Sequence, residues 1–114
     1  MRELHAIQSV LAKVLLKVRE SNQRVRSLSL VIGEIAELDQ AVLQKHWEQL
    51  SKGTPAERAQ LYFRSIKAEV QCMACFQKYH PVDGKIHCPY CGSYGAKILS
   101  GAEFFLESIE LDDE

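Results

Sequence analysis

Four cysteines set the strongest limit on how this chain folds, because they come in two pairs of equal spacing. The pairs are Cys72 with Cys75 and Cys88 with Cys91, which gives the pattern C-x2-C-x12-C-x2-C. Two residues between thiolates allow a tight turn to place both sulfurs on one ion. A second such turn completes a tetrahedron with zinc–sulfur distances of about 2.3 Å. The pattern therefore predicts a zinc ribbon in which all four cysteines are ligands.

Disulfides and an iron–sulfur cluster explain these cysteines less well. The N-terminus alternates charged and apolar residues, so no signal peptide is visible. No run approaches the roughly 18 apolar residues of a membrane span. We therefore expect a cytoplasmic protein with no membrane partner, in a compartment where paired cysteines bind metal. Because four thiolates leave no open coordination position, the zinc is expected to be structural.

Three other residues of the predicted ribbon bear on the zinc site. Gly92 follows the second pair, where such a turn often requires the positive φ that glycine adopts freely. We expect His80 and His87 to be surface histidines. The alternative left open is that one of them exchanges with a thiolate, or hydrogen-bonds to it, and makes zinc coordination sensitive to pH.

The rest of the chain shows helical and strand patterns in turn. Apolar residues recur at steps of three and four over residues 4–21, which predicts an amphipathic helix. Residues 25–32 alternate as in a strand. Asp39 is placed to cap a second helix, which Gly53 and the two residues after it end. In that helix His46 falls at the spacing of a packing residue.

Two further strands complete the pattern. One begins near Leu61, and its apolar phase slips before Ile66, which we interpret as a bulge or as the exit into the ribbon. The other covers residues 104–111. This order predicts an α+β fold, with two helices on a three-stranded sheet and an inserted four-cysteine zinc ribbon. The expected domains are residues 1–70 plus 96–114, and residues 71–95 for the ribbon.

Charge disfavours a nucleic-acid partner. The formal net charge is −1, and the ribbon offers only Lys78 and Lys85 against Asp83, a weak attraction for a nucleic-acid strand. Residues 1–30 hold six Lys or Arg against two Glu, whereas residues 101–114 hold six acids and no base. We expect these two segments to lie side by side. An enzyme is not expected, since there is no glycine-rich phosphate loop and no nucleophile with an orienting base.

Several short motifs occur in one order along the whole chain. The chain begins M-x-E-L, with Q-S-V at residues 8–10, followed by LVIGEI at 30–35 and SKGTPAE at 51–57. The cysteine pairs come next, then LSGAEF at 99–104 and Ser108-Ile109-Glu110. Each motif is weak alone, but the joint order is specific and resembles the hydrogenase maturation factor HypA (HybF) family.

That resemblance implies a function and partners. Members are nickel metallochaperones of [NiFe]-hydrogenase maturation, with two helices on a three-stranded sheet and a projecting zinc ribbon. They work with the GTPase HypB and pass nickel towards the hydrogenase large subunit. By position, the four cysteines of this chain match the family's zinc ligands.

The N-terminus departs from the family at one position. The family begins Met-His-Glu and holds nickel with the terminal amine, backbone amide nitrogens and the histidine at position 2. This chain has Arg2 there, and a guanidinium offers no lone pair to a metal. Glu3 matches the family, and His5 falls in the first turn of the predicted helix. We therefore predict an altered nickel site made by the amine of Met1, Glu3 and His5, against the plainer alternative that His5 is a solvated helix residue.

The sequence thus favours a HypA-type maturation factor that assists nickel insertion and carries a structural zinc. The alternative is a HypA-like zinc-ribbon adaptor that binds maturation proteins without carrying nickel. A nucleic-acid-binding zinc ribbon is a third hypothesis, which the charge disfavours. Both a monomer and a dimer are compatible with the sequence.

Overall fold

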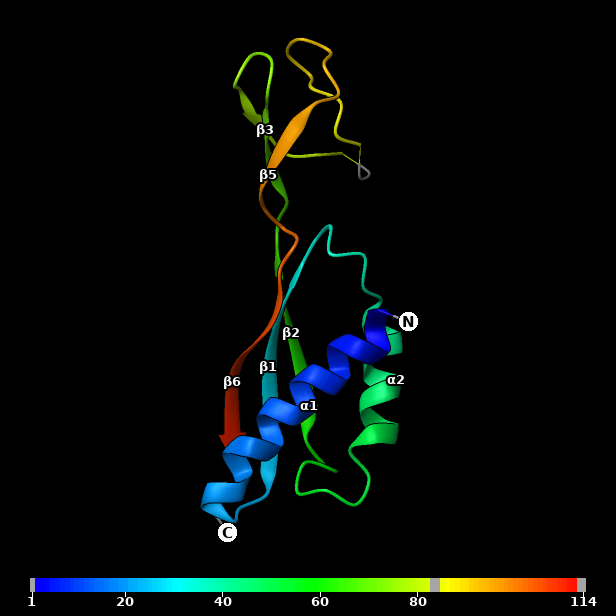
Figure 1. Cartoon of the computed structure of the whole chain (residues 1–114), viewed down its shortest axis with the longest axis vertical. Coiled ribbons are helices and arrows are strands. Elements are labelled where there is room, and N and C mark those ends of the chain that lie inside the picture. The colour runs from blue at the N-terminus through cyan, green and yellow to red at the C-terminus, as the bar shows by residue number, and fades with distance from the viewer. Residues whose placement is uncertain (1, 83–84, 113–114) are drawn as a thin grey trace. The chain divides into compact units, whose positions relative to one another are not determined.

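The computed structural model describes residues 2–82 and 85–112, which form two helices and two sheets of three strands (Figure 1). The elements are α1 (Arg2–Ser21), β1 (Val25–Gly33), α2 (Gln40–Leu50), β2 (Gln60–Ile66), β3 (Glu69–Cys72), β4 (Lys78–Tyr79), β5 (Ala96–Ser100) and β6 (Phe104–Leu111). The strand orders are β2-β1-β6 and β4-β3-β5. The predicted α+β fold, with two helices and a three-stranded sheet, is confirmed.

The chain divides into two compact units. One consists of residues 1–31, 38–64 and 104–114, and the other of residues 32–37 and 65–103. The predicted domain limits, residues 1–70 plus 96–114 and residues 71–95, stay a prediction.

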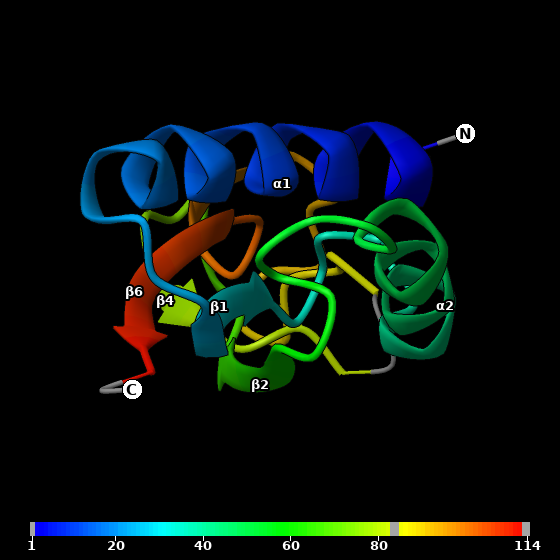
Figure 2. The ribbon, with the colours of Figure 1, turned by 90° about the horizontal axis from the view of Figure 1, so that it is seen from below.

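The first unit is built around the apolar stripe of α1. Ile7, Val10, Val14 and Val18 are at most 4% exposed, at the spacing that the sequence predicts. The helix packs against α2 and β6, and Figure 2 shows it running along one face of the sheet. Burial of each such side chain contributes about 1.5–3 kcal/mol. The helix therefore owes its stability to packing more than to propensity.

Helix α2 begins where the sequence predicts, at an aspartate cap. One carboxylate oxygen of Asp39 accepts hydrogen bonds from the amides of Ala41 (2.8 Å) and Val42 (3.2 Å). The amide of Asp39 itself donates to the carboxylate of Glu3, at 3.1 Å. This last bond ties the first turn of α1 to the start of α2.

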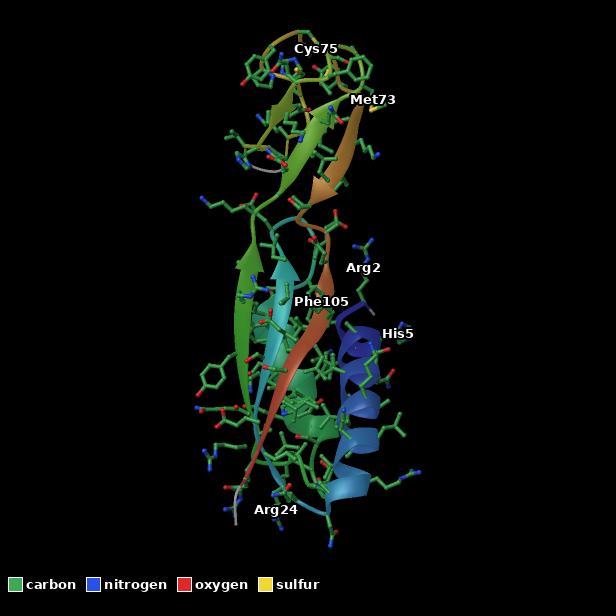
Figure 3. All side chains as sticks on the ribbon, turned by 90° about the vertical axis from the view of Figure 1, so that its left-hand side faces the viewer. Arg2, His5, Arg24, Met73, Cys75 and Phe105 are labelled. Carbon is green, nitrogen blue, oxygen red and sulfur yellow. The ribbon has the colours of Figure 1, made fainter. Side chains whose placement is uncertain are left out.

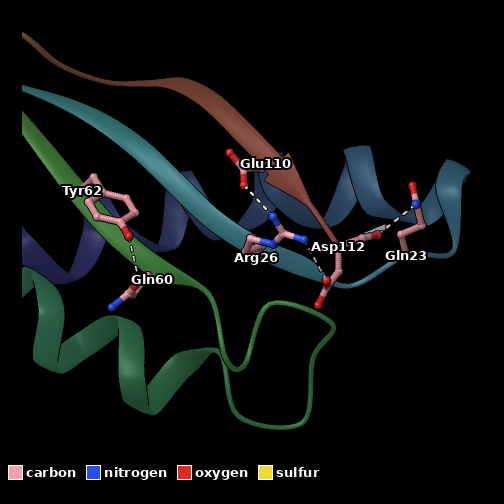
Figure 4. A network of polar contacts seen from close by, with 6 residues as sticks. All are labelled: Gln23, Arg26, Gln60, Tyr62, Glu110 and Asp112. Carbon is pink, nitrogen blue, oxygen red and sulfur yellow. Dashed lines mark hydrogen bonds and ion pairs between the residues drawn. The ribbon is translucent and has the colours of Figure 1, made fainter. Parts of the chain in front are cut away.

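The basic and acidic segments of the chain meet, as predicted from their charges. Arg26 of β1 pairs with Glu110 at 3.1 Å and with Asp112 at 3.3 Å, and Gln23 donates to the backbone carbonyl of Asp112 (Figure 4). Arg64 of β2 forms a bidentate pair with Glu107. Two arginines therefore engage the acidic side chains of β6 and the residue after it.

The phase slip after Leu61 is the exit from the first sheet. Strand β2 ends at Ile66, and β3 starts the second sheet at Glu69. A register irregularity between Glu69 and Val70 interrupts the β3–β5 pairing, so a bulge is also present. The short strands β4 and β5 were not expected from the sequence, because few of their residues alternate. Strand β5 is exposed or half-buried along its length.

Two glycines of the second unit lie where backbone segments come very close to each other. A Cβ on Gly33 would lie 2.1 Å from the carbonyl oxygen of Gly101, and a Cβ on Gly101 would lie 2.4 Å from the Cα of Ala68. The amide of Ile35 donates to the Gly101 carbonyl at 2.8 Å. Both glycines belong to the motifs LVIGEI and LSGAEF, so the structure gives those motifs a steric reason.

Within the described residues, no helix is long and apolar enough to cross a bilayer.

Candidate metal centre and N-terminal region

The two cysteine pairs lie in turns of nearly identical geometry. In the first turn, the amide of Phe76 donates to the Cys72 carbonyl (2.9 Å) and the Cys72 amide donates to the Gln77 carbonyl (3.0 Å). In the second, Gly92 donates to Cys88 at 3.0 Å and Cys88 donates to Ser93 at 2.9 Å. The residue after each pair has positive φ, 64° at Phe76 and 81° at Gly92. The positive φ of Gly92 was predicted, and that of Phe76 was missed because a phenylalanine does not signal such a conformation.

Backbone amides point at the sulfurs of both turns. The amides of Ala74 and Cys75 lie 3.4 Å from the Cys72 sulfur, and the amide of Tyr90 lies 3.4 Å from the Cys88 sulfur. Such donors stabilise a thiolate, which is the form that binds metal. Both turns are therefore shaped to present negatively charged sulfur.

The four sulfurs converge on one point. All of them lie within 4.8 Å of one another, with Cys72–Cys91 at 3.5 Å and Cys75–Cys88 at 3.7 Å. A tetrahedron with zinc–sulfur bonds of about 2.3 Å has sulfur–sulfur edges of about 3.8 Å. The cluster therefore matches the size of a tetrahedral zinc site with four thiolate ligands, and its donor set suits zinc.

The pKa values of two thiols in the cluster, Cys72 and Cys91, shift in opposite directions. Hydrogen bonds from the Cys75 and Ala74 amides outweigh burial and lower the pKa of Cys72 from 9.0 to about 6. At Cys91 the Ser93 amide favours the thiolate, but the hydrogen bond with Cys72 and burial outweigh it and raise the pKa to about 12. The surroundings of Cys72 therefore favour a thiolate, whereas those of Cys91 favour the protonated thiol. Because metal binds thiolates, a divalent ion would release the protons that the sulfurs carry, and its affinity would fall as pH falls.

The ribbon has a very small apolar core. Val70, Cys72, Tyr79 and Cys88 are buried together, with Cys75 and Ala96 packed against them. Met73, between the first two cysteines, is 54% exposed (Figure 3). A core of this size is too small to hold the turns in place without a cross-link, and a bound metal ion would provide that cross-link.

Both ribbon histidines are exposed, as the sequence predicts. Nδ1 of His80 lies 2.7 Å from the Ala68 carbonyl oxygen, and the ring of His87 lies 4.9 Å from that of Tyr94. Neither belongs to the cluster of candidate ligands found among the described residues. An exchange of either histidine with a thiolate stays a prediction.

Two of the three predicted nickel ligands lie in the first turn of α1, where the structure does not bring them together. Met1 lies outside the described residues, and Glu3 and His5 are both in the first turn. His5 is exposed and projects outward from the helix (Figure 3). Glu3 and His5 are two residues apart on a helix and do not face each other. Both can bind one ion only if a third ligand, from the chain before the helix, holds that ion between them.

The Glu3 carboxylate has a neighbour within α2, His46, that the sequence did not identify. The hydrogen bond from the Asp39 amide is the main cause of its lowered pKa, and the charge of the half-buried His46 adds to it. The spacing of His46 in its helix predicts a packing residue and says nothing of Glu3. The proximity of the two depends on how α2 packs on α1, and no local sequence signal reports that packing.

Sequence comparison finds one family over nearly the whole chain. The family described as "Hydrogenase/urease nickel incorporation, metallochaperone, hypA" matches residues 1–111. The hydrogenase maturation factor HypA of Dehalococcoides mccartyi strain CBDB1 is 36% identical over 115 residues, covering 100% of this chain and 97% of the relative. That of Aquifex aeolicus strain VF5 is 31% identical, covering 98% of each.

Solved structures share the fold. The solution structure of the Ni metallochaperone HypA from Helicobacter pylori superimposes with a TM-score of 0.68 at 22% identity, covering 98% of both chains. A second HypA solution structure gives a TM-score of 0.69 at 22% identity, covering 95% of this chain and 93% of the other. At this identity the likeness is one of architecture.

Proposed function

Because the chain belongs to the HypA family of hydrogenase maturation factors and nickel metallochaperones, we propose that it carries nickel for a [NiFe]-hydrogenase and holds a structural zinc. The observation that carries the proposal is the convergence of four sulfurs within 4.8 Å of one another in a chain matched by the family over residues 1–111. On this proposal the protein acts in the cytoplasm and catalyses no reaction. Its partners are a HypB-type GTPase and the hydrogenase large subunit.

In this proposal Cys72, Cys75, Cys88 and Cys91 are the zinc ligands. The supporting observations are the size of the sulfur cluster and the amides aimed at Cys72 and Cys88. Zinc would fix both turns and cover the small core of the ribbon, residues 71–95, which we propose as a separate folding module. It would leave no coordination position for chemistry.

The proposed nickel site is the start of α1, with the amine of Met1, Glu3 and His5 as ligands. Arg2 removes the imidazole that the family has at position 2, and His5 is the next imidazole along the chain. Its exposure leaves it accessible to an ion, and the lowered pKa of Glu3 keeps that carboxylate charged. Imidazole and amine nitrogens suit Ni²⁺ better than oxygen donors alone.

Isothermal titration of zinc-loaded, untagged protein with Ni²⁺ tests this site. We expect micromolar or tighter binding, lost in His5→Ala and in protein that carries one extra N-terminal residue. His46→Gln is the matched control, because it removes the other imidazole near Glu3 and should retain most of the affinity. Binding that depends on His46 and not on His5 would contradict the proposed ligand set.

The runner-up function is a zinc-ribbon adaptor that binds maturation proteins without nickel. The presence of Arg2 favours it, because a fixed positive charge beside the amine opposes a dication. No nickel binding by the intact protein, together with retained binding to a HypB-type GTPase, would select the adaptor. Retention on DNA with a steep salt dependence would instead support a nucleic-acid partner.

A further inference from the structure

The outer edge of β6 is open. In the order β2-β1-β6, this strand pairs with β1 alone among the strands of its sheet. Figures 1 and 3 show no other described strand along that edge. An edge strand presents a row of N–H and C=O groups to which another extended segment can pair.

An apolar groove of about 770 Å³ lies between this strand and α1. Leu16 of α1 and Leu106, Ile109 and Leu111 of β6 supply its apolar lining. Leu16 is 60% exposed, whereas the three β6 side chains are half-buried. The groove therefore continues the core of the first unit outward and leaves a large apolar side chain uncovered.

The helix rim of the groove is basic. Lys13 and Lys17, one helical turn apart, line it and are exposed. Glu107 also lines the groove, on its strand side, but its charge is engaged by Arg64. Glu110 and Asp112 pair with Arg26 (Figure 4). Among the described side chains, none forms an ion pair with either lysine.

We propose that the β6–α1 groove binds an extended, acidic and apolar segment of a partner protein by strand addition. The segment pairs with the free edge of β6, and its side chains on the α1 side alternate between apolar and acidic. The apolar ones cover Leu16 and Leu106, and the acidic ones meet Lys13 and Lys17. This surface involves neither the cysteine cluster nor the start of α1, so it is independent of metal binding.

A second copy of the chain fits the groove less well. Its own β6 would add as the strand, but Glu107 and Glu110 would then have to leave Arg64 and Arg26 to reach the lysines. An unrelated acidic segment meets Lys13 and Lys17 without breaking those ion pairs. Charge complementarity therefore favours a different protein as the occupant.

The test uses the octapeptide LTETLTET, with fluorescein on its N-terminal amine and an amide at its C-terminus, titrated with zinc-loaded full-length protein. We expect saturable binding, measured by fluorescence anisotropy, with amide shifts of β6 in NMR spectra. Lys13→Glu/Lys17→Glu should weaken binding about fivefold or more, since two exposed ion pairs turn repulsive. Lys45→Glu/Lys52→Glu changes the net charge equally, away from the groove, and should leave the affinity unchanged.

Two further variants separate backbone pairing from charge. A peptide methylated on alternate backbone nitrogens should lose binding if strand addition holds it. Leu16→Ser, at an exposed site where folding is spared, should weaken binding of the unmodified peptide. The proposal is overturned if no peptide binds at millimolar concentration, or if both lysine double variants bind equally. Dimerisation that depends on Lys13 and Lys17 without peptide would overturn it in favour of a second copy.

Discussion

At the scale of single residues, two glycines show what the motifs LVIGEI and LSGAEF do in this chain. Gly33 needs no special φ, but the backbone of Gly101 occupies the place of its Cβ. Gly101 combines a φ of 99° with close contact to Ala68. The motif letters could be read from the sequence, whereas the meeting of residues so far apart in the chain could not.

Gly33→Ala should therefore lower the free energy of unfolding by about 3 kcal/mol, because a Cβ 2.1 Å from a carbonyl oxygen forces the backbones apart. Gly53→Ala is the matched control. Gly53 has a φ of 78°, and no atom lies within 4 Å of the place that a Cβ would take, so only conformational strain of about 1 kcal/mol is expected. Urea unfolding of both variants measures the difference, and equal losses would contradict the close approach.

A single carboxylate in the sheet makes stability depend on pH. The hydrogen bond from Arg64 lowers the pKa of Glu107 below its usual 4.5. Since the folded state favours the charged carboxylate, Glu107 stabilises the fold. Its contribution to the free energy of unfolding is complete above about pH 5 and is lost as pH falls through the folded-state pKa.

NMR titration of the Glu107 carboxyl carbon should show the lowered pKa, and Arg64→Gln should return it towards 4.5. Arg58→Gln removes a guanidinium that forms no described ion pair with Glu107, and should leave the titration in place. A Glu107 pKa that does not respond to Arg64→Gln would show that another group holds the carboxylate.

At the scale of elements, the cap of α2 was predictable because capping is local. The Asp39 carboxylate accepts from Ala41 and Val42, within three residues of itself. Asp39→Ala should cost about 1 kcal/mol of stability, whereas Asp39→Asn retains an acceptor and should cost much less. Thermal unfolding of the two variants checks this, and equal melting temperatures would show that the cap contributes little.

Local signals explain which other elements were predictable. The two helices and β1 carry apolar residues at a clear period, β2 and β6 carry apolar stretches whose period is broken, and the cysteine spacing identifies the ribbon. Strand β4 is two residues long and β5 is exposed or half-buried along its length, so neither carries a period to read. The positive φ of Phe76 belongs to a local turn, but a phenylalanine does not signal it. The approach of His46 to Glu3 depends on tertiary contacts, which no local pattern reports.

At the scale of the whole molecule, the proposed zinc site and the proposed nickel site use different donors from different parts of the chain. The sulfur cluster lies in residues 72–91, with soft donors at tetrahedral spacing. The start of α1 offers nitrogen and oxygen donors instead. Softness of the donors should direct zinc to the first and leave nickel to the second.

Native mass spectrometry of untagged protein, loaded with zinc and then titrated with Ni²⁺, tests this account most directly. If the two sites are distinct, each chain holds one zinc that nickel does not displace and binds one nickel in addition. Protein acetylated at its amine should take up the zinc alone. Displacement of zinc by nickel, with no chain carrying both metals, would contradict the account.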